Sequence, residues 1–403
     1  MELKGKTKDS ANNTTFAILL ALSFIHMSND TLQSLIPSVY PLVKNSLHLN
    51  FSQIGLITLV FQLSSSLLQP LIGWYTDKRP QPYSLPLGMC STMVGISLLA
   101  LSNSFGMVLV AVFFTGIGSS ILHPEASRLA YMASGGRTGL AQSIFQVGGN
   151  FGSSLGPLLA ALIIAPYGQF HIIRFTVLAF LTILVMLRVS RWYKRNLYRL
   201  KPREQSVVTE VSQPRLSKRK ITVTFCILLI LIFSKYFYMA SITNYYTFYL
   251  IHKFHVSIQQ SQFFLFAYLF AVAAGTFLGG PIGDKIGRKY VIWFSILGVA
   301  PFSLMMPHLD LFWTCVFSIL IGLILASAFS AILVYAQELV PGKVGMIAGL
   351  FFGFAFGVAG IGSALLGRLA DNIGIEYLYF ICSFLPLIGL VAGFLPNIRK
   401  KRE

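Results

Sequence analysis

The stretch Gly280-Pro-Ile-Gly-Asp284-Lys285 has a counterpart, Gly73-Trp-Tyr-Thr-Asp77-Lys78, that lies 207 residues earlier in the chain. A second pair of related stretches, Gly136-Arg137-Thr-Gly139 and Gly342-Lys343-Val-Gly345, is separated by 206 residues. The members of the first pair each follow a long apolar run, and the members of the second pair each precede one. Two independent landmarks with nearly the same offset indicate that the two halves of the chain repeat one structural unit.

The composition indicates that this unit lies in a lipid bilayer. Of the 403 residues, 55% are hydrophobic and 11% are charged, whereas a soluble chain carries about 25% charged residues. Six apolar runs precede a polar segment and six follow it, and each is long enough to cross a bilayer as a helix. They cover residues 16–43, 52–74, 84–103, 107–132, 139–165, 171–192, 221–250, 258–282, 290–307, 310–337, 344–369 and 376–396. We therefore expect an all-α polytopic membrane protein with 12 transmembrane helices in two pseudo-symmetric six-helix bundles, which is a transporter architecture.

The expected domains are an N-terminal bundle over residues 1–192, a basic cytoplasmic linker over 193–220 and a C-terminal bundle with a basic tail over 221–403. The net charge of +18 comes from Lys and Arg concentrated in the two tails, the linker and alternate loops. This positive-inside pattern predicts that both termini and the linker are cytoplasmic, so the basic charge reports topology and not nucleic-acid binding. We expect the bilayer and a small substrate as partners, no nucleic acid, and a monomer.

Other classes of protein find less support. The four cysteines, Cys90, Cys226, Cys315 and Cys382, fall in separate apolar runs, which suits small apolar side chains better than a disulfide framework. No metal-ligand cluster, phosphate loop or nucleophile motif is visible, so we expect no metal, no cofactor and no enzymatic activity. A ligand sensor built on a transport fold would normally need an output domain, for which the linker and tails are too short.

The loop motifs resemble those of the major facilitator superfamily. Gly280 to Lys289 matches that superfamily's loop motif in full, whereas the earlier copy has Pro80 and Gln81 where the motif wants Gly and Arg. Gly152-Ser-Ser-Leu-Gly156-Pro157 resembles the antiporter motif, with Ser143 in place of an upstream glycine. The loop motif predicts gating residues, the alternative being a role in topology and loop packing alone. These residues are Gly73, Asp77, Gly280, Asp284 and Arg288.

Within that superfamily, five stretches are similar to bacterial fosmidomycin-resistance exporters. They are His123-Pro-Glu-Ala-Ser-Arg128, Met132-Ala-Ser-Gly-Gly-Arg137, Phe145-Gln-Val-Gly-Gly-Asn-Phe-Gly152, Phe233-Ser-Lys-Tyr-Phe-Tyr-Met239 and Val334-Tyr-Ala-Gln-Glu338. The resemblance implies efflux of a small anionic drug, the phosphonate antibiotic fosmidomycin, by proton antiport across the bacterial inner (plasma) membrane. The energy source is then the proton gradient. The alternative is an uptake symporter for a small phosphorylated or carboxylated metabolite.

Two charged residues in apolar runs occupy similar places in the two repeats. Asp30 lies in the first run and Lys235 in the seventh, separated by one residue less than the repeat offset of 206. We expect both to face a central cavity and to attract one another across it, with Asp30 as a proton-coupling residue. The alternative is that each pairs within its own bundle. His26, Asp30 and Gln33 recur at helical spacing and therefore share one face.

The fifth run carries two stripes on opposite faces of a helix. One is polar, and its members are Gln142, Gln146 and Asn150. The other is made of small residues, Gly148, Gly152 and Gly156, which permit close helix contact. We expect the polar stripe to face the cavity, although its amides could instead bond to neighbouring helices.

The fourth run places Glu125 and Arg128 three residues apart, so that the two side chains can touch on one helix face. We expect Glu125 to exchange protons, with Arg128 as its charge partner or as a ligand for an anionic substrate. A structural ion pair is the competing interpretation. His123, nearby, could titrate near neutral pH or serve only in packing.

A phosphonate is small and anionic, and cationic and hydrogen-bonding side chains suit it. Tyr238 follows Lys235 by three residues and could donate a hydrogen bond, although tyrosines near span ends are more often interfacial anchors. The expected substrate-binding residues are His26, His123, Arg128, Gln146, Asn150, Lys235 and Tyr238.

Overall fold

The computed structural model describes residues 14–135, 138–197, 217–286, 288–339 and 344–396. Within these ranges every regular element is a helix. The first half contains α2 (Phe16–Ser38), α3 (Tyr40–Ser46), α4 (Phe51–Ser66), α5 (Leu68–Lys78), α6 (Ser84–Leu101), α7 (Phe105–Ala133), α8 (Thr138–Leu159), the π-helix η1 (Ala160–Ile164), α9 (Ala165–Tyr167), the 3-10 helix η2 (Gln169–Phe175) and α10 (Thr176–Arg195). The second half contains α11 (Lys218–Phe254), α12 (Ile258–Ile286), α13 (Arg288–Leu297), α14 (Ala300–Met305), the 3-10 helix η4 (Met306–His308), α15 (Leu311–Ala326), α16 (Ala328–Leu339), α17 (Val344–Ile373), α18 (Ile375–Cys382) and the 3-10 helix η5 (Leu385–Phe394).

The helices confirm the predicted all-α polytopic fold. In the described part of the chain, 11 helical stretches are long and apolar enough to cross a membrane. The first predicted run is a further helix, α2, which has 23 residues and carries polar side chains through its middle. This polarity distinguishes α2 from the other spans. Polar groups inside a bilayer are costly, so those of α2 need hydrogen-bond partners or a functional role.

Several loops repeat between the two halves of the chain. Left-handed backbone occurs at His48 (φ 51°) and again 207 residues later at His255 (φ 54°). Asn50 begins α4 with a capping box, and the equivalent Ser257 makes the same reciprocal bonds at the start of α12. The sharp turns at the ends of two later spans use Gly168 (φ 91°) and Gly374 (φ 82°), 206 residues apart, where a side chain would be strained. These matches support the predicted pseudo-symmetry with an offset of 207 or 206.

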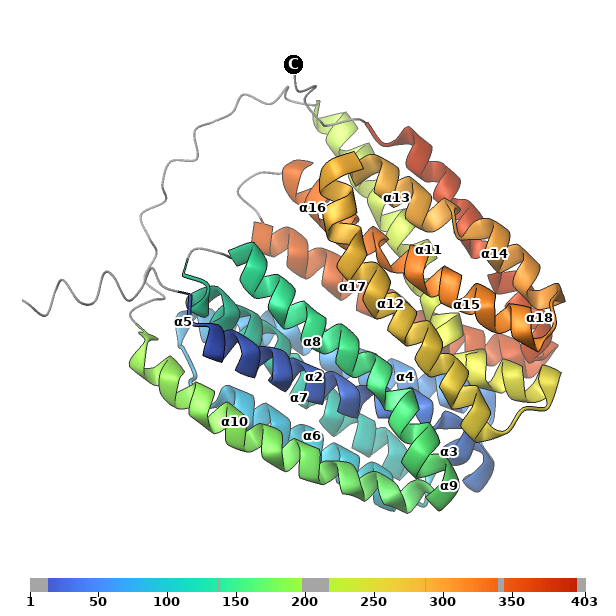
Figure 1. The fold of residues 1–403 in the computed structure, drawn as a ribbon, viewed down its shortest axis with the longest axis horizontal. Helices are drawn as coiled ribbons and strands as arrows, with labels where there is room; N and C mark the ends of the chain where they lie inside the picture. Colours follow the sequence, from blue (N-terminus) through green and yellow to red (C-terminus); the bar gives the residue numbers. More distant parts are fainter. Residues whose placement is uncertain (1–13, 136–137, 198–216, 287, 340–343, 397–403) are drawn as a thin grey trace, which may run out of the picture.

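Figure 1 shows the helices running roughly side by side between two ends of the molecule. At the end that we call the linker end, α10 stops and α11 starts, and α5 and α16 lie there too. At the other end, which we call the distal end, lie α3, α9 and α18. The division into residues 1–192, 193–220 and 221–403 stays a prediction, and most of the linker lies outside the described residues.

Close packing of α2 on α8 sets the geometry of the N-terminal bundle. The glycine stripe of α8 faces α2, because a Cβ on Gly148 or Gly152 would overlap the backbone of Ser23 or Met27. Gly156 meets Ser34 in the same way. The predicted small-residue face is therefore the contact face, and it brings the polar middle of α2 close to α8.

The closest packing between the two bundles is in two helix pairs, α4 with α17 and α8 with α12. Gly55 of α4 permits the first contact, since a Cβ there would lie 2.5 Å from the carbonyl oxygen of Ser363. Several hydrogen bonds between the bundles join residues of the distal half. Asp371 accepts bonds from Phe51 and Ser52, Asn244 accepts one from Thr58, and Ala161 accepts one from Gln259.

Candidate functional site

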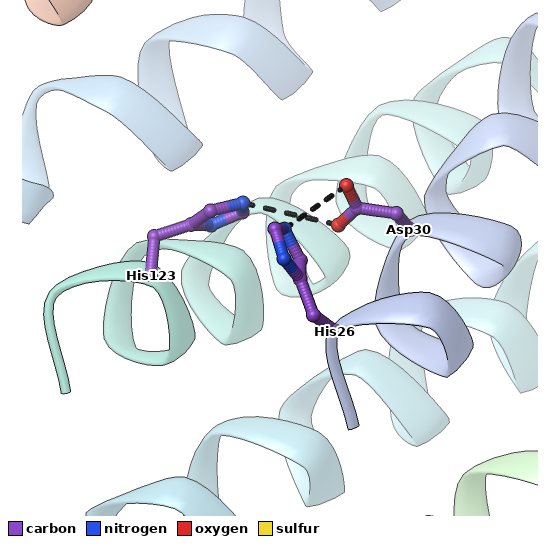
Figure 2. A group of neighbouring side chains, drawn as sticks. All are labelled: His26, Asp30 and His123. Atoms are coloured by element: carbon purple, nitrogen blue, oxygen red, sulfur yellow. Dashed lines mark ion pairs between the residues drawn. The ribbon is translucent and has the colours of Figure 1, made fainter. Parts of the chain in front are cut away.

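Two histidines and an aspartate form a cluster in the N-terminal bundle (Figure 2). His26 and Asp30 lie one turn apart on α2, and His123 reaches them from α7. Nε2 of His26 is 3.2 Å from Oδ2 of Asp30, and Nε2 of His123 is 3.8 Å from Oδ1 of the same carboxylate. We call these three residues the triad.

Backbone carbonyls decide which nitrogens of the triad carry protons. Nδ1 of His26 lies 2.9 Å from the carbonyl oxygen of Phe145, and Nδ1 of His123 lies 3.0 Å from that of Ser119. A carbonyl oxygen only accepts, so each Nδ1 must be the donor, and in a neutral ring Nε2 is then an acceptor. That leaves the Nε2 acceptor of His26 facing a carboxylate oxygen at hydrogen-bond distance. The contact is favourable only when one proton is shared between His26 and Asp30.

Further polar groups extend the triad along α2 and α7. Nδ2 of Asn29 donates to Oδ1 of Asp30 at 3.0 Å. The hydroxyl of Ser119 donates to Oε1 of Gln33 at 3.2 Å and also contacts His123. Nε2 of Gln33 is buried and has no hydrogen-bond partner among the described residues. The face predicted from His26, Asp30 and Gln33 is therefore one connected polar network, with a donor left over.

A residue that sequence reasoning missed holds the His26 ring in place. The ring stacks on Phe145 with centroids 4.0 Å apart, and a Cβ on Gly149 would overlap it. Gly149 immediately follows Gly148 of the small-residue stripe, so the paired glycines were a visible signal. Gly148 leaves room for the backbone of α2, and Gly149 leaves room for the imidazole of His26.

Asp30 and Glu125, the two predicted proton carriers, differ in exposure. The Asp30 side chain is 18% exposed and that of His123 is 26% exposed. Glu125 is fully buried, at 0%, and its Oε1 lies 3.0 Å from Nη1 of Arg128. In this conformation Asp30 is therefore the more accessible of the two carboxylates.

Arg128 ties two helices together as well as pairing with Glu125. Its Nη1 donates to the carbonyl oxygen of Thr76 at 2.7 Å, and its Nη2 donates to Oγ1 of Thr76 at 2.9 Å and to the carbonyl oxygen of Gly73 at 3.4 Å. These bonds satisfy carbonyls near the C-terminal end of α5, where the first loop motif lies. This geometry favours a structural ion pair between Glu125 and Arg128 over the proton-exchange role that we expected for Glu125.

Asp30 and Lys235, which we expected to attract one another across a cavity, each make contacts within their own bundle in this conformation. Asp30 contacts His26, His123 and Asn29, all within its own bundle. Nζ of Lys235 is buried and donates to the carbonyl oxygen of Ala326 at 3.5 Å. The left-handed pair at the adjoining loops sets the repeat offset at 207 in this part of the chain, so Lys235 corresponds to Ser28, two residues and about 200° of helix rotation from Asp30. The attraction between Asp30 and Lys235 across a cavity stays a prediction.

The other predicted residues lie apart from the triad contacts. Gln146 is exposed and Asn150 is half-buried on the α8 face opposite the glycine stripe, while Gln142 is outside the described side chains. Tyr238 is buried among apolar residues, and its hydroxyl has no hydrogen-bond partner among the described residues.

Of the predicted gating residues, Gly73 accepts a bond from Arg128, and the half-buried Arg288 begins α13. The side chains of Asp77 and Asp284, and the surroundings of Gly280, lie outside the described residues. Their gating role stays a prediction.

The three donor atoms of the triad lie within 4.8 Å of one another, a spacing that one metal ion could bridge. Sequence reasoning did not find this grouping, because His123 is distant from the other two along the chain. The expectation that no metal takes part stays a prediction, and a single proton is enough to satisfy the His26–Asp30 contact.

The model of the Major Facilitator Superfamily matches residues 22–252 and 224–403, which together cover almost the whole chain. The chain belongs to the major facilitator superfamily. This membership makes it a membrane transporter and not an enzyme, as predicted.

Two relatives in this superfamily align over nearly their full length. The chain is 60% identical over 388 residues to the fosmidomycin resistance protein of Escherichia coli (strain K12), covering 96% of this chain and 95% of the relative. It is 43% identical over 401 residues to YfnC of Bacillus subtilis (strain 168), an uncharacterized transporter of the superfamily, covering 100% and 98%.

Solved structures of other transporters share the superfamily fold. A bacterial homologue of the human lysosomal transporter Spinster, in an inward-facing and unoccupied conformation, matches with a TM-score of 0.76 and 14% identity, covering 96% of this chain and 98% of that one. A mutant of the nucleoside transporter NupG matches with a TM-score of 0.72 and 11% identity, covering 95% and 100%. At these identities the likeness concerns the fold alone.

Proposed function

We propose that this protein is a proton-coupled exporter of small anionic drugs in the bacterial inner membrane, with fosmidomycin as the first candidate substrate. The observation that supports fosmidomycin as a substrate is the 60% identity to the Escherichia coli fosmidomycin resistance protein along 96% of the chain. Identity of this extent covers both bundles and the loops between them, so it is not a likeness of fold alone. Alternating access between the bundles supplies the transport step.

The triad supports the proton part of the proposal. Its contact between His26 and Asp30 requires one shared proton, and Asp30 is the more exposed of the two candidate acids. We therefore assign proton exchange first to Asp30, with the histidines as its partners. Glu125 remains the second candidate, for a conformation in which its pair with Arg128 opens.

Cationic and donor groups support recognition of an anion. Lys235 is a buried cation of the C-terminal bundle, and the Gln33 amide, whose Nε2 has no partner in the described part of the chain, adjoins the triad. A phosphonate needs both charge partners and hydrogen-bond donors. Arg128 is less suited to this role than expected, because its guanidinium already serves α5 and Glu125.

The positive-inside pattern supports the orientation. Basic residues Lys194 and Arg195 end α10, and Lys218 to Lys220 begin α11, all at the linker end. Lys and Arg are enriched on the cytoplasmic side of membrane proteins. The linker end, together with both termini, is therefore the cytoplasmic side, and the distal end faces outward.

One feature of the triad favours the uptake symporter as a second candidate. Loading a proton makes the triad less negative, which favours simultaneous binding of an anion. Antiport requires instead that proton and substrate alternate on the protein. The direction of flux under a known gradient separates the two mechanisms.

The test is fosmidomycin flux in proteoliposomes under an imposed proton gradient, for wild type, Asp30→Asn and Glu125→Gln. Antiport predicts flux against the direction of proton flow, lost in Asp30→Asn while ligand binding is retained. Flux in the direction of the protons would establish the symporter. Gradient-driven flux that is unchanged in Asp30→Asn and lost in Glu125→Gln, with ligand binding retained in both variants, would transfer the coupling role to Glu125. Absence of wild-type flux in either direction would remove fosmidomycin as the substrate.

A further inference from the structure

A carboxylate of the C-terminal bundle binds the start of a helix in the N-terminal bundle. Oδ1 of Asp371, near the end of α17, accepts the backbone N–H of Phe51 at 2.8 Å. Its Oδ2 accepts the N–H of Ser52 at 2.8 Å and the hydroxyl of Ser52 at 2.5 Å. Three bonds to one side chain make this an extensive polar contact between the bundles.

These bonds complete the cap of α4. The first N–H groups of a helix have no partner within the helix and must be satisfied from outside. Asn50, the N-cap, accepts only the N–H of Gln53. Asp371 supplies acceptors for the two N–H groups before it, and its negative charge is favoured at this end of the helix dipole. The first turn of α4 is thus capped jointly by both bundles.

The repeat shows that the fold does not require this carboxylate. With the offset of 206 set by Gly168 and Gly374, the residue equivalent to Asp371 is Ala165. At the pseudo-equivalent interface, α12 begins with the same kind of capping box, and the Gln259 side chain donates to the carbonyl oxygen of Ala161 at 3.0 Å. One interface therefore has a charged, three-bond contact, and its counterpart has a single neutral one.

We propose that Asp371 is the latch that holds the distal end closed, and that its release from α4 is a step in opening the transporter at that end. The bonds lie at the exposed edge of the interface, where water can replace them as they break. Such a contact can stabilise the closed state of the distal end and still allow that end to open. Asp371 is a positioning residue, and the proposal rests on alternating access but not on the identity of the substrate or on proton coupling.

The test measures the distance distribution between the bundles at the distal end. Spin labels at Asn45→Cys and Tyr377→Cys, two exposed sites on α3 and α18, are introduced after replacement of the native cysteines. Asp371→Asn, which retains the shape but loses the charge, shifts the ratio of closed to open populations toward open by about three- to tenfold. Ser52→Ala removes one of the three bonds and gives a smaller shift in the same direction.

Glu376→Gln is the matched control. Glu376 is an exposed acid at the same end, but it pairs with His252 inside the C-terminal bundle at 2.8 Å. This variant leaves the distance distribution unchanged, and the thermal stability of all three variants in detergent stays near that of the wild type. A distribution for Asp371→Asn that matches the wild type would overturn the latch. A shift of equal size in Glu376→Gln would do so as well. Because the measurement needs no substrate, a failure of the proposed drug export would not affect it.

Discussion

Nε2 of His26 and Oδ2 of Asp30 lie 3.2 Å apart on successive turns of α2. The equivalent helix of the second half, α11, has phenylalanines at the corresponding positions when the 207-residue offset of the adjoining loops is applied. The pair was therefore not needed to build the repeated fold. An acid and an imidazole within a membrane span, at positions where α11 carries phenylalanines, are more readily explained by function, because polar groups in a bilayer are costly.

Replacing Asp30 by Asn should uncouple transport from the proton gradient. The amide keeps the size of the side chain but cannot hold the shared proton that the His26 contact requires. We expect gradient-driven flux to fall to the level seen without a gradient, with substrate binding retained. The measurement is flux in proteoliposomes with and without the gradient. Gradient-dependent flux at the wild-type rate would show that the proton is carried elsewhere.

Adding one methyl group at Gly149, which is not a member of the triad, should displace the His26 ring from Asp30. The Cβ would overlap the His26 ring, and overpacking of this kind costs about 1–3 kcal/mol. We expect Gly149→Ala to lower coupled flux by about tenfold, because the ring must leave Asp30 to relieve the overlap.

Gly353→Ala is the matched control for this substitution. Gly353 is also a helical glycine, but nothing lies within 4 Å of a Cβ placed there. The control should transport normally. Equal losses in both variants would mean that the effect comes from helix composition and not from the position of His26.

The features that the sequence predicted correctly are those governed by the bilayer and by helical spacing. Apolar runs must become helices, and the three-residue separation of Glu125 and Arg128 places them in contact, as the structure confirms. The spacing of His26 and Asp30 likewise placed both on one face. Such arguments need only one helix at a time, which is why they succeed without knowledge of the packing.

The features that were missed depend on contacts between helices. His123 joins Asp30 only because α7 crosses α2 at that level, and the roles of the imidazole nitrogens depend on the carbonyls of Phe145 and Ser119. The partners of Asp30 in this conformation, His26, His123 and Asn29, likewise depend on how α2 and α7 pack, and the attraction between Asp30 and Lys235 stays a prediction. No pattern within a single run carries that information.

The buried pair of Glu125 and Arg128 should behave as one unit in a double-mutant cycle. Removing one partner leaves the other charge buried and unpaired, which costs about 3–5 kcal/mol. We expect Glu125→Gln and Arg128→Gln each to lower the thermal stability in detergent substantially. The double variant should lose less than the sum of the two single losses. Additive losses would show that Arg128 stabilises the protein through α5 alone, independently of Glu125.

A methyl group at Gly55 should open the distal contact by a route that does not involve Asp371. Gly55 lets α4 approach α17 so closely that a Cβ would lie 2.5 Å from the carbonyl oxygen of Ser363 and 2.8 Å from Cα of Ala364. Both neighbours are backbone, so they cannot turn aside as a flexible side chain would. We expect Gly55→Ala to separate the two helices and to move the spin-label distances at the distal end in the same direction as Asp371→Asn.

Gly357→Ala provides the comparison for that variant, since Gly357 lies on α17 with nothing within 4 Å of a Cβ placed there. Its distance distribution should match that of the wild type. If Gly55→Ala also leaves the distribution unchanged, the close approach of α4 and α17 does not limit opening at the distal end. In that case the polar contacts alone would hold it closed. If Gly55→Ala and Asp371→Asn combine to a larger shift than either alone, backbone packing and the carboxylate act as separate contributions to one closed state.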